Sequence, residues 1–332
     1  MSLVTGTRDS VGEGSGLTLV LGPSDDLRAE IYIRAWLPSG VVDPRLGGTL
    51  VGPRCRWAST LPVVARLAAA NPAPGAAAAL AKTVLTEPSY WTPDLPNVYR
   101  LEARLADGDH TVATFDMMVG LRRLGVRGRS FWLDGRRWVP RGVSRVAATC
   151  DPAALHQAGL GVAMVDPPAG LCCAADEIGM PIIGFLATAS GASLDPQAAA
   201  GRIAAWAIHP SVVLAVVPAE NSPGEAAAIA ALARGLKGTL LIGAVVDGGS
   251  PPPPAVAEGI DCLVVSLAGA ALPHAAWRDA APALPLVAWR PGRIETGSDR
   301  RGCDVLQADL AAWGLADGAA RPAWDWAGYI VA

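Results

Sequence analysis

The sequence predicts a multidomain β plus α/β protein, with an N-terminal immunoglobulin-like β-sandwich followed by a compact (β/α)8 TIM barrel. In roughly the first 120 residues, short strand patterns alternate with turn residues, as in antiparallel sandwiches. Beyond residue 125, apolar strand patterns alternate with Ala-rich helical stretches, as in parallel barrels. The 332 residues suffice for both folds. The predicted division is a flexible tail over residues 1–16, the sandwich over 17–124 and the barrel over 125–332.

Strands of the sandwich are predicted from alternation of apolar and polar residues. In the segment 29–36, Ile31 and Ile33 fall on one face, and Glu30, Tyr32 and Arg34 on the other. The low-complexity stretch 68–79 predicts a loop. The predicted strands are 17–21, 29–36, 61–67, 80–85, 98–105 and 111–119.

Strands of the barrel are predicted from short, continuous apolar runs. Val212–Val217 is apolar throughout, which suits a parallel sheet covered on both faces. A helix over 223–236 is predicted to begin at Ser222 as N-cap, with Pro223 in its first turn, and another helix over 303–315. The eight predicted strands are 138–143, 161–165, 181–186, 212–217, 239–246, 261–267, 285–289 and 327–331.

Composition argues against several classes of function. The net charge of −3 and the presence of only two lysines give no basic field for nucleic acid. No run of 18 apolar residues lacks a charge, Pro or Gly, so we expect no transmembrane span in this chain. The first 16 residues contain no apolar signal core, which favours the cytoplasm.

The cysteines and histidines show no spacing typical of a metal or cofactor site. None of the six cysteines forms a C-x-x-C pair, and the four histidines are scattered. The adjacent Cys172 and Cys173 suit a helix packed against the barrel. We therefore expect reduced, structural thiols, no metal and no cofactor.

Several motifs, in order along residues 80–332, resemble those of the family-2 glycoside hydrolases, the β-galactosidase and β-glucuronidase group. The resemblance implies a sandwich joined to a barrel, and a catalytic pair of glutamates at the barrel mouth. It rests on these segments: Trp91-Thr-Pro-Asp-Leu-Pro-Asn-Val-Tyr99, Val119-Gly-Leu-Arg122, Leu133-Asp-Gly-Arg-Arg-Trp-Val-Pro-Arg-Gly-Val143, Cys173-Ala-Ala-Asp-Glu-Ile-Gly-Met-Pro-Ile-Ile183 and His209-Pro-Ser211.

The same resemblance indicates that the catalytic pair is incomplete. Glu220 falls on the family's acid/base position, but Ala219 replaces the sugar-binding Asn before it. Arg290 occupies the position of the nucleophilic Glu. On the second barrel strand, Met164 replaces an Arg. We expect no catalytic residues, a vestigial Glu220, and a salt bridge between Glu220 and Arg290 that would keep this acid ionised.

Other residues remain as alternatives for catalysis. Asp166, Asp247 and Ser266 lie near the C-terminal ends of predicted strands, where barrel enzymes place their chemistry. Asp247 also begins a turn sequence. Glu295 could replace the missing nucleophile, although its charged neighbours favour a solvated loop.

The leading hypothesis is a non-catalytic, glycoside-hydrolase-like protein that acts as a structural or protein-interaction module. Its partners would be other protein subunits, in the cytoplasm or at the periphery of a membrane complex. The alternatives are an active glycoside hydrolase using Glu220 as acid/base, and a carbohydrate-binding module; a small sugar would bind only under these. The C-terminal Trp313, Trp324 and Trp326 are candidate interface residues, with closure of the barrel as the competing interpretation.

Overall fold

The computed structural model describes residues 16–71, 78–187, 193–235, 240–268, 272–280, 283–292, 299–315 and 324–332. By their internal contacts these residues form two compact units. The first contains the chain up to Gly52, then Leu61–Pro88 and Tyr99–Met118. The second contains Pro53–Thr60, Ser89–Val98 and the chain from Val119 onward. The predicted division at residue 124 stays a prediction.

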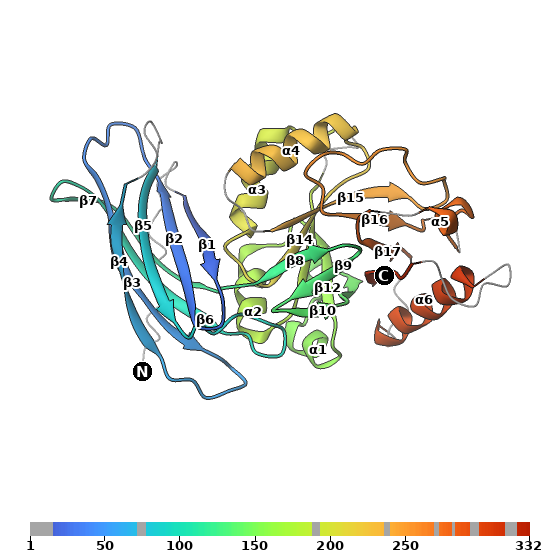
Figure 1. Ribbon diagram of the computed structural model, residues 1–332, viewed down its shortest axis with the longest axis horizontal. Helices are drawn as coiled ribbons and strands as arrows, with labels where there is room; N and C mark the ends of the chain where they lie inside the picture. Colours follow the sequence, from blue (N-terminus) through green and yellow to red (C-terminus); the bar gives the residue numbers. More distant parts are fainter. Residues whose placement is uncertain are drawn as a thin grey trace. The chain divides into compact units, whose positions relative to one another are not determined.

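The first unit is a seven-stranded sheet in the order β1-β2-β5-β4-β3-β6-β7 (Figure 1). The printed pairings β1–β2, β2–β5, β4–β5 and β3–β4 are antiparallel. Along β2 every second residue is buried, including Ile31 and Ile33, as the alternation predicts. The strands are β1 (Leu17–Ser24), β2 (Arg28–Trp36), β3 (Pro44–Arg54), β4 (Val63–Ala70), β5 (Ala78–Thr86), β6 (Val98–Asp107) and β7 (His110–Val119).

Two sequence predictions in this unit need correction. Strand β3 was not predicted, because its Pro44, Gly47, Gly48, Gly52 and Pro53 resemble a loop. The predicted loop 68–79 is too long, since residues 68–70 belong to β4 and residues 78 and 79 to β5. The sheet confirms a β domain, and its immunoglobulin-like topology stays a prediction.

The second unit contains a closed barrel of eight parallel strands, which run in chain order from β11 to β18. A small sheet in the order β10-β9-β8 precedes it: β8 (Leu124–Arg127), β9 (Ser130–Leu133) and β10 (Arg136–Trp138). All eight predicted barrel strands are confirmed to within a few residues. They are β11 (Arg141–Ser144), β12 (Gly161–Val165), β13 (Ile182–Phe185), β14 (Val212–Val217), β15 (Leu241–Asp247), β16 (Cys262–Ser266), β17 (Leu286–Arg290) and β18 (Gly328–Val331).

Helices follow most of these strands, and polar caps start several of them. Asp151 and Asp195 each accept hydrogen bonds from the first turn of a helix whose first residue is Pro. Ser222 and Glu225 form a reciprocal capping box, which confirms the predicted start of α4. The helices are α1 (Pro152–Gln157), α2 (Ala169–Ile178), α3 (Pro196–Trp206), α4 (Pro223–Gly235), α5 (Ala276–Asp279) and α6 (Asp299–Gly314), with a 3-10 turn, η1, at Ala147–Thr149.

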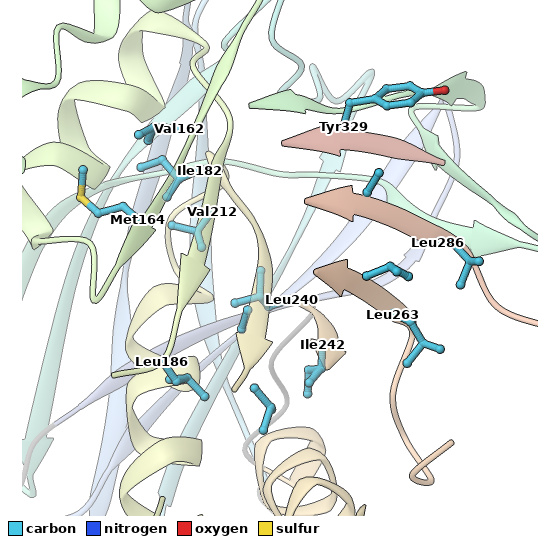
Figure 2. Close-up of a cluster of buried hydrophobic side chains, with 14 of the residues drawn as sticks. Val162, Met164, Ile182, Leu186, Val212, Leu240, Ile242, Leu263, Leu286 and Tyr329 are labelled. Carbon is cyan, nitrogen blue, oxygen red and sulfur yellow. The ribbon is translucent and has the colours of Figure 1, made fainter. Parts of the chain in front are cut away.

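The main hydrophobic core lies between the barrel strands and the helices (Figure 2). Alternate strand residues, such as Val162 and Met164 on β12 or Leu286 and Ala288 on β17, belong to this core together with helix residues. Because side chains alternate along a strand, the intervening residues point to the barrel interior. This alternation decides which strand residues can reach a site at the barrel mouth. Within the described residues, no helix is long and apolar enough to cross a bilayer.

Candidate active site at the barrel mouth

The mouth of the barrel, where the strands have their C-terminal ends, is the candidate site. The strand ends bring Asp166, Glu220, Asp247, Ser266 and Arg290 to this end of the barrel. The pairings of Asp247 with Ser266 and of Ser266 with Trp289 show that three successive strands end at the same level. The topology therefore gathers the predicted residues at one end, and their side-chain contacts decide what they can do.

Glu220 lies in an exposed turn between β14 and α4. Its carboxylate forms no hydrogen bond or ion pair with any described residue. The next residue, Asn221, is buried, and its side chain joins the backbone N–H and C=O of Leu194 at 3.4 and 3.5 Å. Asn221 thus fixes this turn against Leu194, and Glu220 beside it is exposed to solvent.

Arg290 points away from the mouth, which corrects the expected salt bridge with Glu220. It follows Leu286 and Ala288 in the alternation of β17, and both of these pack against the outer helices. Its Nη1 contacts Oδ2 of Asp309 on α6 at 2.9 Å. The side chain at the nucleophile position therefore serves to join a strand to a helix outside the barrel.

The residue that points inward from the end of β17 is Trp289. Its ring contacts the ring of Phe185 with centroids 4.8 Å apart and an interplanar angle of 47°. Phe185 ends β13, the third strand of the barrel, and Trp289 lies on β17, the seventh. Strands three and seven of an eight-stranded barrel face each other across its axis. The two rings therefore meet across the barrel interior near its mouth.

The remaining described polar groups at the mouth serve local structure. Both carboxylate oxygens of Asp166 contact Nη1 of Arg202 on α3 at 2.9 Å. Asp247 accepts hydrogen bonds from the hydroxyl of Ser250 and the backbone N–H of Gly249, and these bonds hold its pKa below the ordinary value. A general acid needs a raised pKa. The turn at Asp247 lowers the pKa of this carboxyl, which is the wrong direction for that role. Glu295 lies outside the described residues.

The opposite end of the barrel, its base, contains a buried network built from Asp176 of α2. This carboxylate is only 2% exposed and accepts hydrogen bonds from the backbone N–H of Ser211 at 2.9 Å and from Nδ1 of His209 at 2.7 Å. The indole of Trp91 donates to the backbone oxygen of Asp176 at 2.8 Å. His209 thus helps to close the base of the barrel.

Arg122 supplies the positive charge of the base network. Its Nη1 donates to the backbone oxygens of Pro210 and Val212. Burial lowers the pKa of Arg122 to about 10, and the nearby Asp176 carboxylate acts against that shift. The guanidinium still stays charged at neutral pH and pairs electrostatically with the buried carboxylate.

At two glycines of the base, neighbouring atoms lie so close to the backbone that no side chain would fit. A Cβ on Gly120 would lie 2.4 Å from Pro210, and a Cβ on Gly179, where φ is +89°, would lie 2.2 Å from the oxygen of Pro93. Most motifs of the resemblance thus meet in this one network, which holds the base of the barrel together.

The three C-terminal tryptophans are buried in the core of the barrel unit. Trp313, Trp324 and Trp326 are 6%, 9% and 5% exposed, and their rings contact one another. The indole of Trp324 donates to the backbone oxygen of Trp277 at 3.1 Å. Their burial fits the interpretation that they close the barrel, and it leaves them little surface for a partner.

Sequence reasoning missed Phe185, Arg202, Asp309 and Asn221. The inward direction of Phe185 and Trp289 follows from alternation once the strand ends are fixed, so that signal was available. The pairs Asp166–Arg202 and Arg290–Asp309 join residues of a strand and a later helix, for which one sequence offers no local signal. The described residues contain no group of three His, Cys, Asp or Glu that could hold a metal ion.

Comparisons with known proteins were made by sequence and by structure. No family model matches the chain, and no curated protein matches it by sequence. Solved structures do match. The β-glucuronidase of Bifidobacterium dentium, complexed with coumarin-3-O-glucuronide, has a TM-score of 0.63 at 15% identity, over 95% of this chain and 59% of that one.

Two further structures show the same likeness. The β-D-glucuronidase of Dictyoglomus thermophilum has a TM-score of 0.61 at 13% identity, over 95% of this chain and 61% of that one. Bacteroides uniformis β-glucuronidase 2, covalently bound to cyclophellitol-6-carboxylate aziridine, has a TM-score of 0.55 at 14% identity, over 84% and 40%. The chain therefore has a family-2 glycoside-hydrolase-like fold, and it spans at most about three fifths of the length of these matches.

Proposed function

We propose that the chain is a non-catalytic, glycoside-hydrolase-like protein that works as a structural or protein-interaction module. The observation that supports this most strongly is the contact between Phe185 and Trp289 across the barrel interior. A glycosidase needs two carboxyl groups separated by about 5 Å or by roughly 6.5 to 9.5 Å, with the sugar between them. In this barrel two aromatic rings meet across the interior near the mouth.

The charges at the mouth support the same proposal. Glu220 lies in an exposed turn, and no described side chain contacts its carboxylate to orient it toward a substrate. Arg290 stands where a nucleophile would be needed and pairs with Asp309 on the outer side. Loss of the nucleophile removes the covalent route to hydrolysis.

The test is turnover of aryl β-glucuronides, β-galactosides and β-mannosides by the purified protein, beside the matched variant Glu220→Gln. We expect release of the aryl group at the background rate for both proteins. Turnover by the unchanged protein that disappears in Glu220→Gln would overturn the proposal and establish the alternative of an active hydrolase. We also expect the protein to co-purify in a stable complex with other protein subunits.

A second candidate is sugar binding without hydrolysis, and one observation favours it. Nε1 of Trp289 is buried and has no hydrogen-bond partner in the described part of the chain, while part of the residue remains accessible. An indole N–H in this state can donate to a hydroxyl oxygen of a ligand. Calorimetric titration with glucuronate and galactose, compared between the unchanged protein and Trp289→Phe, separates this candidate from the leading one.

A further inference from the structure

The sheet of the first unit ends in strand β1, which pairs with β2 on one side and with no described strand on the other. Gly16 lies opposite Trp36, and its oxygen accepts a hydrogen bond from the Trp36 N–H at 2.9 Å. Backbone groups alternate in direction along an antiparallel strand, so the N–H and C=O groups of Leu17, Leu19 and Leu21 point away from β2. No described residue forms a hydrogen bond with these outward groups.

Strand β1 lacks the features that usually prevent an edge strand from pairing with another chain. Charged side chains, proline and bulges are the common ones. The segment Leu17–Leu21 contains neither a charged residue nor a proline, and its register with β2 is regular. The register shifts only after Leu21, next to Pro23, whereas β7 at the other end of the sheet carries the charged Asp116. Over these five residues β1 can therefore accept a further strand.

The leucines of this edge form an incompletely covered rim of the hydrophobic core. They lie opposite Ile31, Ile33 and Ala35 of β2, and opposed residues of neighbouring strands share one face of the sheet. The three β2 residues are 0% exposed, whereas the three leucines of β1 are only partly buried. A strand added at this edge would cover apolar surface and satisfy backbone groups at the same time.

The edge is complementary to itself. Its sequence, Leu17-Thr-Leu-Val-Leu21, reads nearly the same in both directions. In an antiparallel pair of two copies centred on Leu19, this residue lies opposite itself and Leu17 lies opposite Leu21 of the second copy. Thr18 then lies opposite Val20, a residue of similar shape.

The same register matches the hydrogen-bonding groups. In an antiparallel pair, opposed residues whose backbone groups face each other exchange two hydrogen bonds. The outward groups belong to Leu17, Leu19 and Leu21, and in this register each of them meets outward groups of the second copy. A slip of one residue would set outward groups against residues whose backbone is already bonded to β2, so it would lose these bonds.

We propose that the chain forms a two-fold symmetric dimer in which the β1 strands of two copies pair antiparallel about Leu19. A two-fold interface uses the same surface on both copies and must be self-complementary, which is why a second copy is the occupant of this edge. The pairing joins two seven-stranded sheets into one and places the leucines of both copies side by side. It involves only the first unit, so dimer formation and glycoside turnover are independent and are measured separately.

Oxidative cross-linking tests the register. Leu19→Cys places two thiols opposite each other with Cα atoms about 5.5 Å apart, within the range of disulfides. In the matched control Leu17→Cys, four positions separate the two introduced thiols along the strands, which is roughly 13 Å. We expect a disulfide-linked dimer for Leu19→Cys, and only background for Leu17→Cys and the unchanged protein on non-reducing gels. Failure of Leu19→Cys to cross-link, or equal cross-linking of Leu17→Cys, would overturn the proposal.

Sedimentation equilibrium of the full chain measures the association itself. We expect a reversible monomer–dimer equilibrium. Leu19→Pro removes an N–H that points outward, so the bonds between β1 and β2 remain, while each copy loses one donor of the central pair. Its dimer dissociation constant should rise about tenfold or more.

Leu27→Ser is the matched control, because Leu27 is 74% exposed in the turn after β1 and lies outside the paired edge. This variant should dimerise as the unchanged protein does, and circular dichroism checks the fold of every variant. A monomer at every concentration, or equal dissociation constants for Leu19→Pro and Leu27→Ser, would show that the edge does not bind a second copy.

Discussion

The two ends of the barrel differ in how their charged residues are used. At the base, Asp176, His209, Arg122 and the backbone around Ser211 form a buried network with matched partners. At the mouth, Glu220 is exposed without a described partner, and Arg290 is directed to the outer helix α6. The motifs that resemble a glycosidase lie mainly at the base, where they support the fold. The likeness thus extends to the architecture, while the chemistry at the mouth stays a proposal.

The largest effect is expected at the base, from Asp176→Ala. This change leaves the buried Arg122 without its carboxylate and the N–H of Ser211 without its acceptor. We expect a loss of about 3–5 kcal/mol in the free energy of unfolding of the barrel unit, measured by urea denaturation. The matched mouth variant Glu220→Gln should change this free energy by less than about 0.5 kcal/mol. Equal losses in the two variants would remove the contrast between base and mouth.

A slightly smaller effect is expected from the aromatic pair. Phe185 is buried, so Phe185→Ala should destabilise the barrel unit by about 3 kcal/mol through lost apolar contact and a cavity. Phe185→Leu keeps most of the volume and should cost under half as much. Thermal and urea unfolding of both variants give the comparison. A mouth that is already open to solvent would show almost no loss in either variant.

A still smaller effect is expected at the start of α4, directly after Glu220. Ser222→Ala removes the hydroxyl that caps Glu225 N–H and should cost about 1 kcal/mol in unfolding free energy. The hydrogen bond from the Ser222 backbone lowers the pKa of Glu225, so this acid binds protons more weakly when folded than when unfolded. Ionised Glu225 therefore adds to the free energy of unfolding at neutral pH, and this contribution is lost as the pH falls through the acid range. The penalty of Ser222→Ala should largely persist at pH 3, because the hydroxyl does not titrate; a destabilisation by Glu225→Ala that is as large at pH 3 as at pH 7 would contradict the capping box.

The smallest effect is expected in thiol labelling, which compares the reactivity of the adjacent residues Cys172 and Cys173. Cys173 is exposed, whereas burial raises the pKa of the Cys172 thiol to about 12 and that of Cys303 to about 11. Raised values mean that the folded state disfavours thiolate, the reactive form, at every pH below them. At pH 8 we expect rapid alkylation of Cys173 and slow alkylation of Cys172, measured by mass spectrometry of peptides. Equal rates would show that α2 opens from the barrel.

The fold was largely predictable, because strand periodicity and helix caps are local signals. The eight barrel strands and the capping box at Ser222 follow from patterns a few residues long. Strand β3 gives no periodic signal, because its glycines and prolines interrupt the alternation and Gly48 is required by the close approach of the Glu102 backbone, which sequence periodicity does not record.

The mouth was less predictable than the fold. Aligning motifs placed Arg290 in the nucleophile position, but alternation along β17 sends its side chain outward and Trp289 inward. The contact of Trp289 with Phe185 joins residues more than a hundred positions apart, which only the closure of the barrel brings together.

The most direct test of the central claim, that the mouth lacks a catalytic acid pair, is covalent labelling. Cyclophellitol-6-carboxylate aziridine is found covalently bound to Bacteroides uniformis β-glucuronidase 2, which makes that protein the positive control. After incubation with this reagent, intact-mass spectrometry of the present chain should show only the unmodified mass, while the control shows one adduct. A stoichiometric adduct on this chain, mapped to a carboxylate such as Glu220 or Glu295 and lost on its substitution by Gln or Asn, would contradict the account.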